Sequence, residues 1–205
     1  MKDIGGGLPA AGAALPRRDA APPVRGLFLD RDGTLIEHVP YLSRPEEVVL
    51  LPGVREALAT SLAHGVKLFL FTNQSGVGRG YFTLEDVDAV NRRMIALLGL
   101  GDEPFTAVCI APEHPDAPAV YRKPSPRFIL EMLSRYGIPA EAAWMIGDSP
   151  CDWHAGRNAG VRTAAIVSAG EDRKTRDDRT KHSVPSYPAL LDWARETLAE
   201  AGRHG

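Results

Sequence analysis

The sequence contains little cysteine, no long apolar run and no excess of basic residues. Cys109 and Cys151 are too few for a disulfide framework or, alone, for a structural zinc site, so we expect two free thiols in a reducing compartment. No segment approaches the roughly 18 consecutive apolar residues of a membrane-spanning helix. A formal net charge of -2 argues against broad nucleic-acid binding, which requires an excess of basic residues. These absences favour a cytoplasmic protein with neither a nucleic-acid nor a membrane partner.

The composition that remains is typical of a soluble globular protein with one core: 44% of the 205 residues are hydrophobic and 24% are charged. Residues 1–23 are rich in Gly, Ala and Pro. Because Gly and Pro interrupt any apolar run there, we interpret this segment as a flexible extension and not as a signal peptide. Residues 24–205 are assigned to a single domain, which we expect to be monomeric.

Short apolar runs alternate with helical patterns from Gly26 onwards. The runs predict strands at 26–29, 66–71, 105–110, 143–146 and 163–167, and the patterns predict helices at 54–64, 84–98, 126–136, 151–159 and 188–201. Strands that alternate with helices imply an α/β fold, a three-layer, Rossmann-like parallel sheet with helices on both faces. The connections after Asp32 and Gly76 are too short for a second folded domain, so no large cap domain is expected.

Some conspicuous segments are interpreted as structural. Residues 171–185 are charged and aperiodic, which predicts an exposed loop. Trp144 and Trp193 fall in predicted elements and are assigned to the core. Packing is also the preferred role of Trp153 and His154, although both follow an acidic stretch and could touch a substrate. His64 and His182 are interpreted as surface residues.

Four polar clusters fall where predicted strands end or just beyond: DRDGT at 30–34, TNQSG at 72–76, RK at 122–123 and GDSPCD at 147–152. Ligands of parallel α/β sheets gather beyond the carboxyl ends of the strands, so the coincidence weighs more than any one cluster. Each cluster alone has a simpler interpretation: an acidic turn, a strand-to-helix connection, a solvated basic pair and a helix N-cap. A calcium loop is disfavoured for the first, because its twelfth position holds Tyr41 where glutamate is required.

Together the clusters describe phosphoryl transfer. Two carboxylates one residue apart, Asp30 and Asp32, repel each other unless a cation or proton lies between them. The TNQSG turn offers a hydroxyl, an amide and backbone N–H groups to phosphoryl oxygens, and the basic pair offers two cations. The last cluster adds carboxylates that suit Mg²⁺. We therefore predict a magnesium-dependent phosphatase in which one carboxylate attacks phosphorus and another protonates the leaving oxygen.

The chain resembles the haloacid dehalogenase-like (HAD-like) phosphatase superfamily in FLDRDGTL, FTNQSGVGRGYFT, YRKPSP and GDSPCD, in this order and spacing, from about Gly26 to Val167. Within it, these motifs are similar to those of D-glycero-D-manno-heptose 1,7-bisphosphate 7-phosphatases and histidinol-phosphate phosphatases. The resemblance implies a HAD-like fold, an aspartyl-phosphate intermediate and a heptose bisphosphate of lipopolysaccharide-precursor synthesis as the substrate. Alternatives are histidinol phosphate or another small metabolite, a DNA 3′-phosphatase, and a non-catalytic binding protein.

The resemblance also implies roles for individual residues. Asp30 would be the nucleophile and Asp32 the general acid and base. Thr72 and Lys123 would stabilise the transferring phosphoryl group. Mg²⁺ would be held by Asp30, the backbone carbonyl of Asp32 and Asp148, with Asp152 in an outer position. The substrate would be bound by His38, Tyr41, Thr72, Asn73, Gln74, Ser75, Arg122 and Lys123.

The chain departs from this family in one loop. Many of these phosphatases hold a structural zinc with a Cys-x-His pair and a later Cys-x-Cys pair just before Arg-Lys-Pro. The corresponding positions here are Ala111, Glu113, Ala119 and Tyr121. The nearby Cys109 and His114 are too few for a four-coordinate site, so no structural zinc is expected.

Overall fold

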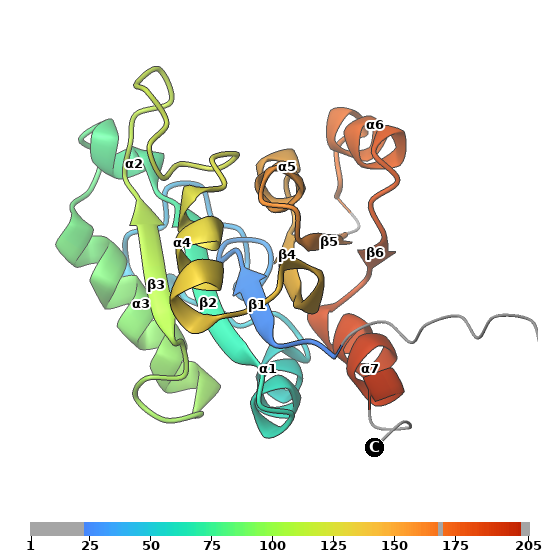
Figure 1. The fold of residues 1–205 in the computed structure, drawn as a ribbon. Coiled ribbons are helices and arrows are strands. Elements are labelled where there is room, and N and C mark those ends of the chain that lie inside the picture. The colour runs from blue at the N-terminus through green and yellow to red at the C-terminus, as the bar shows by residue number, and fades with distance from the viewer. Residues whose placement is uncertain (1–22, 168–169, 202–205) are drawn as a thin grey trace, which may run out of the picture.

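The computed structural model describes residues 23–167 and 170–201, so the predicted extension lies outside the described residues except for its last position. The described chain forms one parallel sheet with the strand order β3-β2-β1-β4-β5-β6 (Figure 1). The strands are β1 Gly26–Leu29, β2 Lys67–Asn73, β3 Ala107–Ala111, β4 Ala143–Gly147, β5 Arg162–Ile166 and β6 Ser186–Tyr187. The parallel sheet predicted from the alternation of strands and helices is confirmed.

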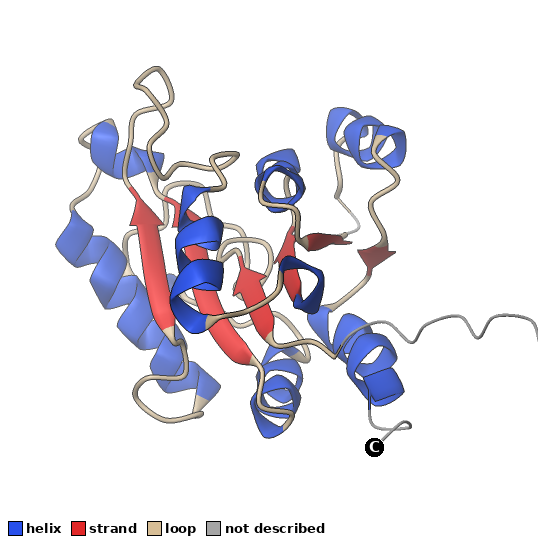
Figure 2. Cartoon of the chain, in the orientation of Figure 1, coloured by secondary structure: helices blue, strands red, loops and turns tan. Residues whose placement is uncertain are grey.

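Helices cover both faces of this sheet (Figure 2). They are α1 Val54–Ala63, α2 Ser75–Gly78, α3 Leu84–Leu98, α4 Arg127–Tyr136, α5 Pro150–Asn158, α6 Arg173–Lys181 and α7 Leu190–Ala201, with short 3-10 turns at Pro45–Glu47 and Ala140–Ala142. Successive side chains of β1 point to opposite faces: Leu27 and Leu29 pack with α1, α3 and α7, whereas Phe28 packs with α4 and α5. The expected three-layer fold is therefore confirmed, since the central strands are buried on both faces.

Two helix ends show why the sequence signals worked. Thr83 caps α3 through a capping box, in which its hydroxyl accepts from the backbone N–H of Asp86 and the Asp86 carboxylate accepts from the backbone of Thr83. Gly137 ends α4 with a left-handed φ of 59°, a conformation that costs other residues free energy. Both helices lie where the pattern predicted them.

The segment 171–185 is not the loop that the sequence predicted. It contains α6, and β6 follows it directly. α6 buries none of its residues and so has no apolar period to detect; it is held by the Asp172 cap and by ion pairs such as Arg173–Asp177, four residues apart. β2 is also longer than predicted, because Thr72 and Asn73 continue the pairing with β3.

The tryptophans lie in the core as predicted. Trp144 and Trp193 are buried and meet edge to face, with 5.7 Å between ring centroids. Trp153 is fully buried against Ala165 and Val184. Among the described residues, no helix combines the length and hydropathy needed to cross a bilayer.

Candidate active site

A cavity of about 400 Å³ opens beyond the carboxyl ends of the strands, at the central strand β1. The chain runs from β1 outwards to β2 and β3 on one side and to β4, β5 and β6 on the other, so β1 lies where ligands are expected. Residues from all four polar clusters line the cavity. The predicted site residues among them are Asp30, Asp32, His38, Tyr41, Asn73, Gln74, Ser75, Lys123, Asp148 and Asp152.

Lys123 lies at the centre of a buried ion cluster. Its ammonium donates to Asp30 Oδ1 and Asp152 Oδ1, both at 2.6 Å, and to the carbonyl of Phe71 at 2.8 Å. The lysine is 1% exposed. Burial alone lowers the pKa of an ammonium, but the carboxylates of Asp152 and Asp30 outweigh it and hold the pKa of Lys123 above its usual value. Lys123 is therefore a fixed positive charge beside the predicted nucleophile.

Asn73 holds Lys123 in place from the end of β2. Its side-chain Oδ1 accepts from the Lys123 backbone N–H at 2.9 Å, and its Nδ2 donates to the Lys123 carbonyl at 3.2 Å. The side-chain amide of Asn73 thus pairs with both the N–H and the C=O of Lys123, as the backbone of a neighbouring strand would. The family resemblance implied a substrate-binding role for Asn73; these bonds add a role in positioning the lysine.

The remaining acids crowd around Asp30. Burial, followed by the charges of neighbouring carboxylates, raises the pKa of Asp148 to about 8. Burial also raises the pKa of Asp30 to about 7, against the opposing effect of Lys123. The crowding depends on two glycines: a Cβ at Gly33 would lie 2.0 Å from Asp148 Oδ2, and one at Gly147 would lie 2.2 Å from Asp152 Cγ.

This acid cluster fits a divalent cation. Asp30, Asp148 and Asp152 each offer an oxygen, and the three atoms lie within 4.8 Å of one another. An all-oxygen donor set with few carboxylates suits Mg²⁺, which keeps some of its waters. Burial, and after it the neighbouring carboxylates, raise the pKa values of Asp30 and Asp148, so a further positive charge would stabilise both carboxylates. Asp152 also accepts from the backbone N–H of Ser149 at 3.0 Å and so anchors the start of α5.

The Asp32 carboxylate points to a second set of partners. It accepts from Arg31 Nε and Nη2 at 3.1 and 3.2 Å and from Gln74 Nε2 at 2.9 Å. Arg31 is fully buried and also donates to Asn91 Oδ1 on α3, at 3.0 Å. The sequence analysis assigned no site role to Arg31 or Asn91. The position of Arg31 between two acidic residues was a signal that could have indicated its ion pair with Asp32.

Two of the predicted site residues do not line the cavity. Thr72 is fully buried at the end of β2, where its hydroxyl accepts from Gln74 Nε2 at 2.9 Å. That bond leaves the hydroxyl proton available for donation. Arg122 is half-buried, and its Nε is a buried atom without a hydrogen-bond partner. Their predicted roles remain predictions.

The rim of the cavity is open and aromatic. His38 is exposed, and Tyr41 is 52% exposed with a left-handed φ of 56°. The Tyr41 ring meets Tyr81 edge to face, with 4.8 Å between centroids. Tyr81 follows the TNQSG turn, so the two predicted substrate-binding segments come together at this rim.

The loop that departs from the family is fastened by a carboxylate. Glu113 Oε1 accepts from the backbone N–H groups of Tyr121 at 2.7 Å and Arg122 at 3.2 Å. Burial raises the pKa of Glu113, but these and other backbone hydrogen bonds together outweigh it and hold the pKa below its usual value. Glu113 and Tyr121 stand at two of the four positions that hold zinc ligands in many of the related phosphatases. The contact connects the loop directly to the residue before Lys123.

Comparisons with known proteins give this geometry a context. The HAD-hydrolase-like family model matches residues 120–193. The chain is 34% identical over 159 residues, 71% of its own length and 70% of the relative's, to the D-glycero-beta-D-manno-heptose-1,7-bisphosphate 7-phosphatase of Mesorhizobium japonicum. It is 33% identical to the enzyme of the same name from Helicobacter pylori, covering 83% of this chain and 97% of the relative.

A solved structure agrees with these sequence matches. The D,D-heptose 1,7-bisphosphate phosphatase from B. bronchiseptica, complexed with magnesium and phosphate, superimposes with a TM-score of 0.78 at 27% identity. The match covers 86% of this chain and 99% of the other. The fold therefore occurs in a protein that was crystallised with both ions.

Proposed function

Because the chain belongs to the haloacid dehalogenase-like phosphatases, we propose that it is a D-glycero-D-manno-heptose 1,7-bisphosphate 7-phosphatase whose single domain spans residues 24–205. The observation that carries the proposal is the buried cluster in which Lys123 binds Asp30 and Asp152 beside Asp148. Such a cluster provides a nucleophile, a fixed cation and oxygen ligands on the floor of one cavity. Its relatives supply the identity of the sugar.

Asp30 is the nucleophile in this proposal. One of its oxygens bonds to Lys123, which leaves Oδ2 free of that contact and available to attack. As the bond from Asp30 to phosphorus forms, the bond from phosphorus to the sugar oxygen breaks, and Asp32 donates a proton to that oxygen. The Thr72 hydroxyl and Lys123 stabilise the equatorial phosphoryl oxygens.

The second half of the reaction uses the same residues in reverse roles. Asp32, now ionised, takes a proton from water, whose oxygen attacks the aspartyl phosphate and releases inorganic phosphate and Asp30. Hydrogen bonds from Arg31 and Gln74 fix the orientation of the Asp32 carboxylate, so it does not have to reorient between the two steps. That rigid support is consistent with one carboxyl group acting first as an acid and then as a base.

The cluster around Asp30 would hold Mg²⁺ with Asp148, the backbone carbonyl of Asp32 and, at an outer position, Asp152. When bound, Mg²⁺ supplies positive charge that offsets the repulsion between the carboxylates and the phosphate. The chain's own contribution is to bring these oxygens together, through Gly33 and Gly147, before any ligand arrives. The acids thus meet the substrate already oriented.

The cavity suits a sugar phosphate. Its volume of about 400 Å³ lies within the usual range of small-molecule sites, and no separate domain covers it within the part of the chain that the structure describes. His38, Tyr41 and Ser75 are proposed to contact the sugar from the rim. Arg122 lies next to Lys123 in the chain and is proposed to pair with the phosphate that is retained.

A phosphate-release screen tests the proposal. The panel contains both anomers of heptose 1,7-bisphosphate, histidinol phosphate, hexose phosphates and a 3′-phosphorylated oligonucleotide, each with Mg²⁺ and with EDTA. We expect the highest kcat/KM on a heptose bisphosphate, loss of turnover in EDTA and recovery with Mg²⁺. ³¹P NMR of the product should show that the anomeric phosphate is retained.

Asp30→Asn provides the matched control, because it preserves size and hydrogen bonding but removes the nucleophile. We expect kcat to fall by at least about 10⁴-fold, as when a member of a catalytic unit is removed. Wild-type turnover in this variant would contradict the mechanism. Good activity only on histidinol phosphate or on the oligonucleotide would keep the mechanism and reject the heptose substrate.

A further inference from the structure

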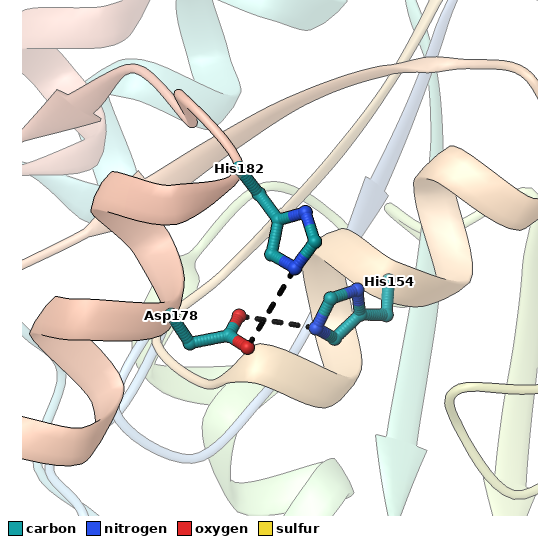
Figure 3. A group of neighbouring side chains, drawn as sticks. All are labelled: His154, Asp178 and His182. Carbon is teal, nitrogen blue, oxygen red and sulfur yellow. Dashed lines mark ion pairs between the residues drawn. The ribbon is translucent and has the colours of Figure 1, made fainter.

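A second group of metal-binding side chains lies outside the active-site cavity, between α5 and α6 (Figure 3). His154 comes from α5, Asp178 from α6 and His182 from the residue that follows α6. His154 Nε2 lies 3.0 Å from Asp178 Oδ1, and His182 Nε2 lies 3.8 Å from Asp178 Oδ2. Figure 3 shows both imidazole rings directed at one carboxylate.

The spacing of these atoms matches a transition-metal site. Two ligands that each lie about 2.0–2.1 Å from a tetrahedral Zn²⁺ are separated by about 3.3 Å, between the two distances found here. Asp178 and His182 are four residues apart, so they share one face at the end of α6. Imidazole nitrogen and carboxylate oxygen are donors that Zn²⁺ accepts, whereas Mg²⁺ prefers oxygen alone.

Hydrogen bonds from neighbouring residues also hold the cluster in place. Trp153 is fully buried, and its indole Nε1 donates to Asp178 Oδ1 at 2.9 Å. Arg157 Nη1 donates to the backbone carbonyl of His182 at 2.9 Å. Outer hydrogen bonds of this kind orient the ligands of metal sites. Each of the three ligand side chains is between 27% and 30% exposed, so an ion can enter and a water can complete the coordination.

We propose that His154, Asp178 and His182 bind one Zn²⁺ or a similar divalent transition-metal ion that fastens α6 to α5. α6 buries no residue of its own, so it lacks apolar packing against α5. The ion would add to the hydrogen bond that Trp153 of α5 makes with Asp178. The proposal departs from our expectation that the protein holds no structural zinc, an expectation based on a different loop. It is independent of the phosphatase proposal, because the acids that line the active-site cavity belong to a separate cluster.

Zinc titration of the metal-free, full-length protein in excess Mg²⁺ tests this site. The stoichiometry and Kd are compared between the wild type, His154→Ala, Asp178→Asn and His182→Ala. His64→Ala is the matched control, since that exposed histidine caps the end of α1 and its ring bonds to the backbone carbonyl of Thr60. We expect the control to behave like the wild type and each site variant to lose at least about 100-fold in affinity for one ion, since even outer ligand partners contribute about 10–100-fold.

A second readout separates binding at this site from a folding defect. Co²⁺ in place of zinc should give d–d absorption bands in the wild type and in His64→Ala that are absent from the site variants. Zn²⁺ should raise the Tm of the wild type but not of Asp178→Asn, a variant that keeps the size of the side chain. Equal zinc stoichiometry and affinity in wild type and site variants would overturn the proposal, and so would a wild type that binds no zinc, which would leave only an ion pair here.

Discussion

The active site and α6 are both held by ion pairs, but they place these pairs in opposite environments. Around Asp30, the side chains of Lys123 and Asp152 are each 1% exposed. On α6, Arg173 and Asp177 are 92% and 68% exposed. Exposed pairs contribute about 0.2–1 kcal/mol, whereas breaking a buried pair costs about 3–5 kcal/mol because it leaves an uncompensated charge. Similar residue types therefore form a buried charge cluster in one region and a largely exposed local support in the other.

The largest expected effect comes from removing the buried cation. Lys123→Met leaves Asp30 and Asp152 buried together, so the free energy of unfolding should fall by about 3–5 kcal/mol. Phosphate release should fall by at least about 100-fold, because a fixed cation is lost from the phosphoryl site. Urea denaturation and steady-state kinetics measure the two effects.

Lys174→Met is the matched control for this comparison. Lys174 is an exposed residue of α6, so the same substitution should change the unfolding free energy by no more than about 0.5 kcal/mol. If both variants unfolded at the same urea concentration, the contrast between buried and exposed charge would be wrong for this protein.

Arg31→Lys tests the support of Asp32. Lysine keeps the charge but loses the planar fork that reaches both Asp32 and Asn91. We expect kcat to fall by about 100-fold, the lower end of what a positioned acid–base group contributes, with a smaller change in KM. An increase in KM at unchanged kcat would show instead that Arg31 serves substrate binding.

Asn73→Ala removes the two hydrogen bonds that hold the backbone of Lys123. We expect kcat to fall by about tenfold, and the unfolding free energy to fall by about 1–3 kcal/mol for the unpaired groups. Asn158→Ala is the control. Asn158 is exposed and donates to the backbone carbonyl of Pro124, the residue that follows Lys123. An equal loss in both variants would refute a specific role for Asn73.

The smallest expected effect is on the ion pairs before α6, in Glu171→Gln, where the partners Arg176 and Arg179 are 59% and 17% exposed. The Arg179 and Arg176 guanidinium groups hold the pKa of Glu171 below its usual value, so the carboxylate stabilises the fold above about pH 4.5. That stabilisation, at most about 1 kcal/mol, is lost as the pH falls through the lowered pKa. Wild type and variant should therefore differ in Tm at pH 7 and converge in acid; a difference that grows in acid would contradict this assignment.

The sequence was most informative where its patterns have a single physical cause. The apolar runs at 66–71 and 143–146 predicted strands because strands buried on both faces have no polar alternation, and both lie inside the sheet. Thr83 and Gly137 marked helix ends because the capping and left-handed conformations favour those residues. α6 escaped prediction, since a helix that buries nothing leaves no apolar period.

The candidate site was predicted less completely. The clusters at the strand ends located Asp30, Lys123 and Asp148, because the carboxyl ends of parallel strands meet at one edge. The hydrogen bond from Arg31 to Asn91 joins residues 60 positions apart, and no local pattern contains such a contact. The same limit applies to His154, Asp178 and His182, which we had interpreted as unrelated surface or packing residues.

The sequence by itself thus determined the class of fold and the kinds of groups available for catalysis, because periodicity, capping and residue type are local properties of the chain. Only the tertiary structure decided which charges are buried together and which face water. Burial raises the pKa values of Asp30 and Asp148, and the carboxylates that the fold places beside Lys123 keep that lysine charged. Both effects depend on all the elements that close over the cavity. The same three-dimensional packing brought two histidines and an aspartate together between α5 and α6.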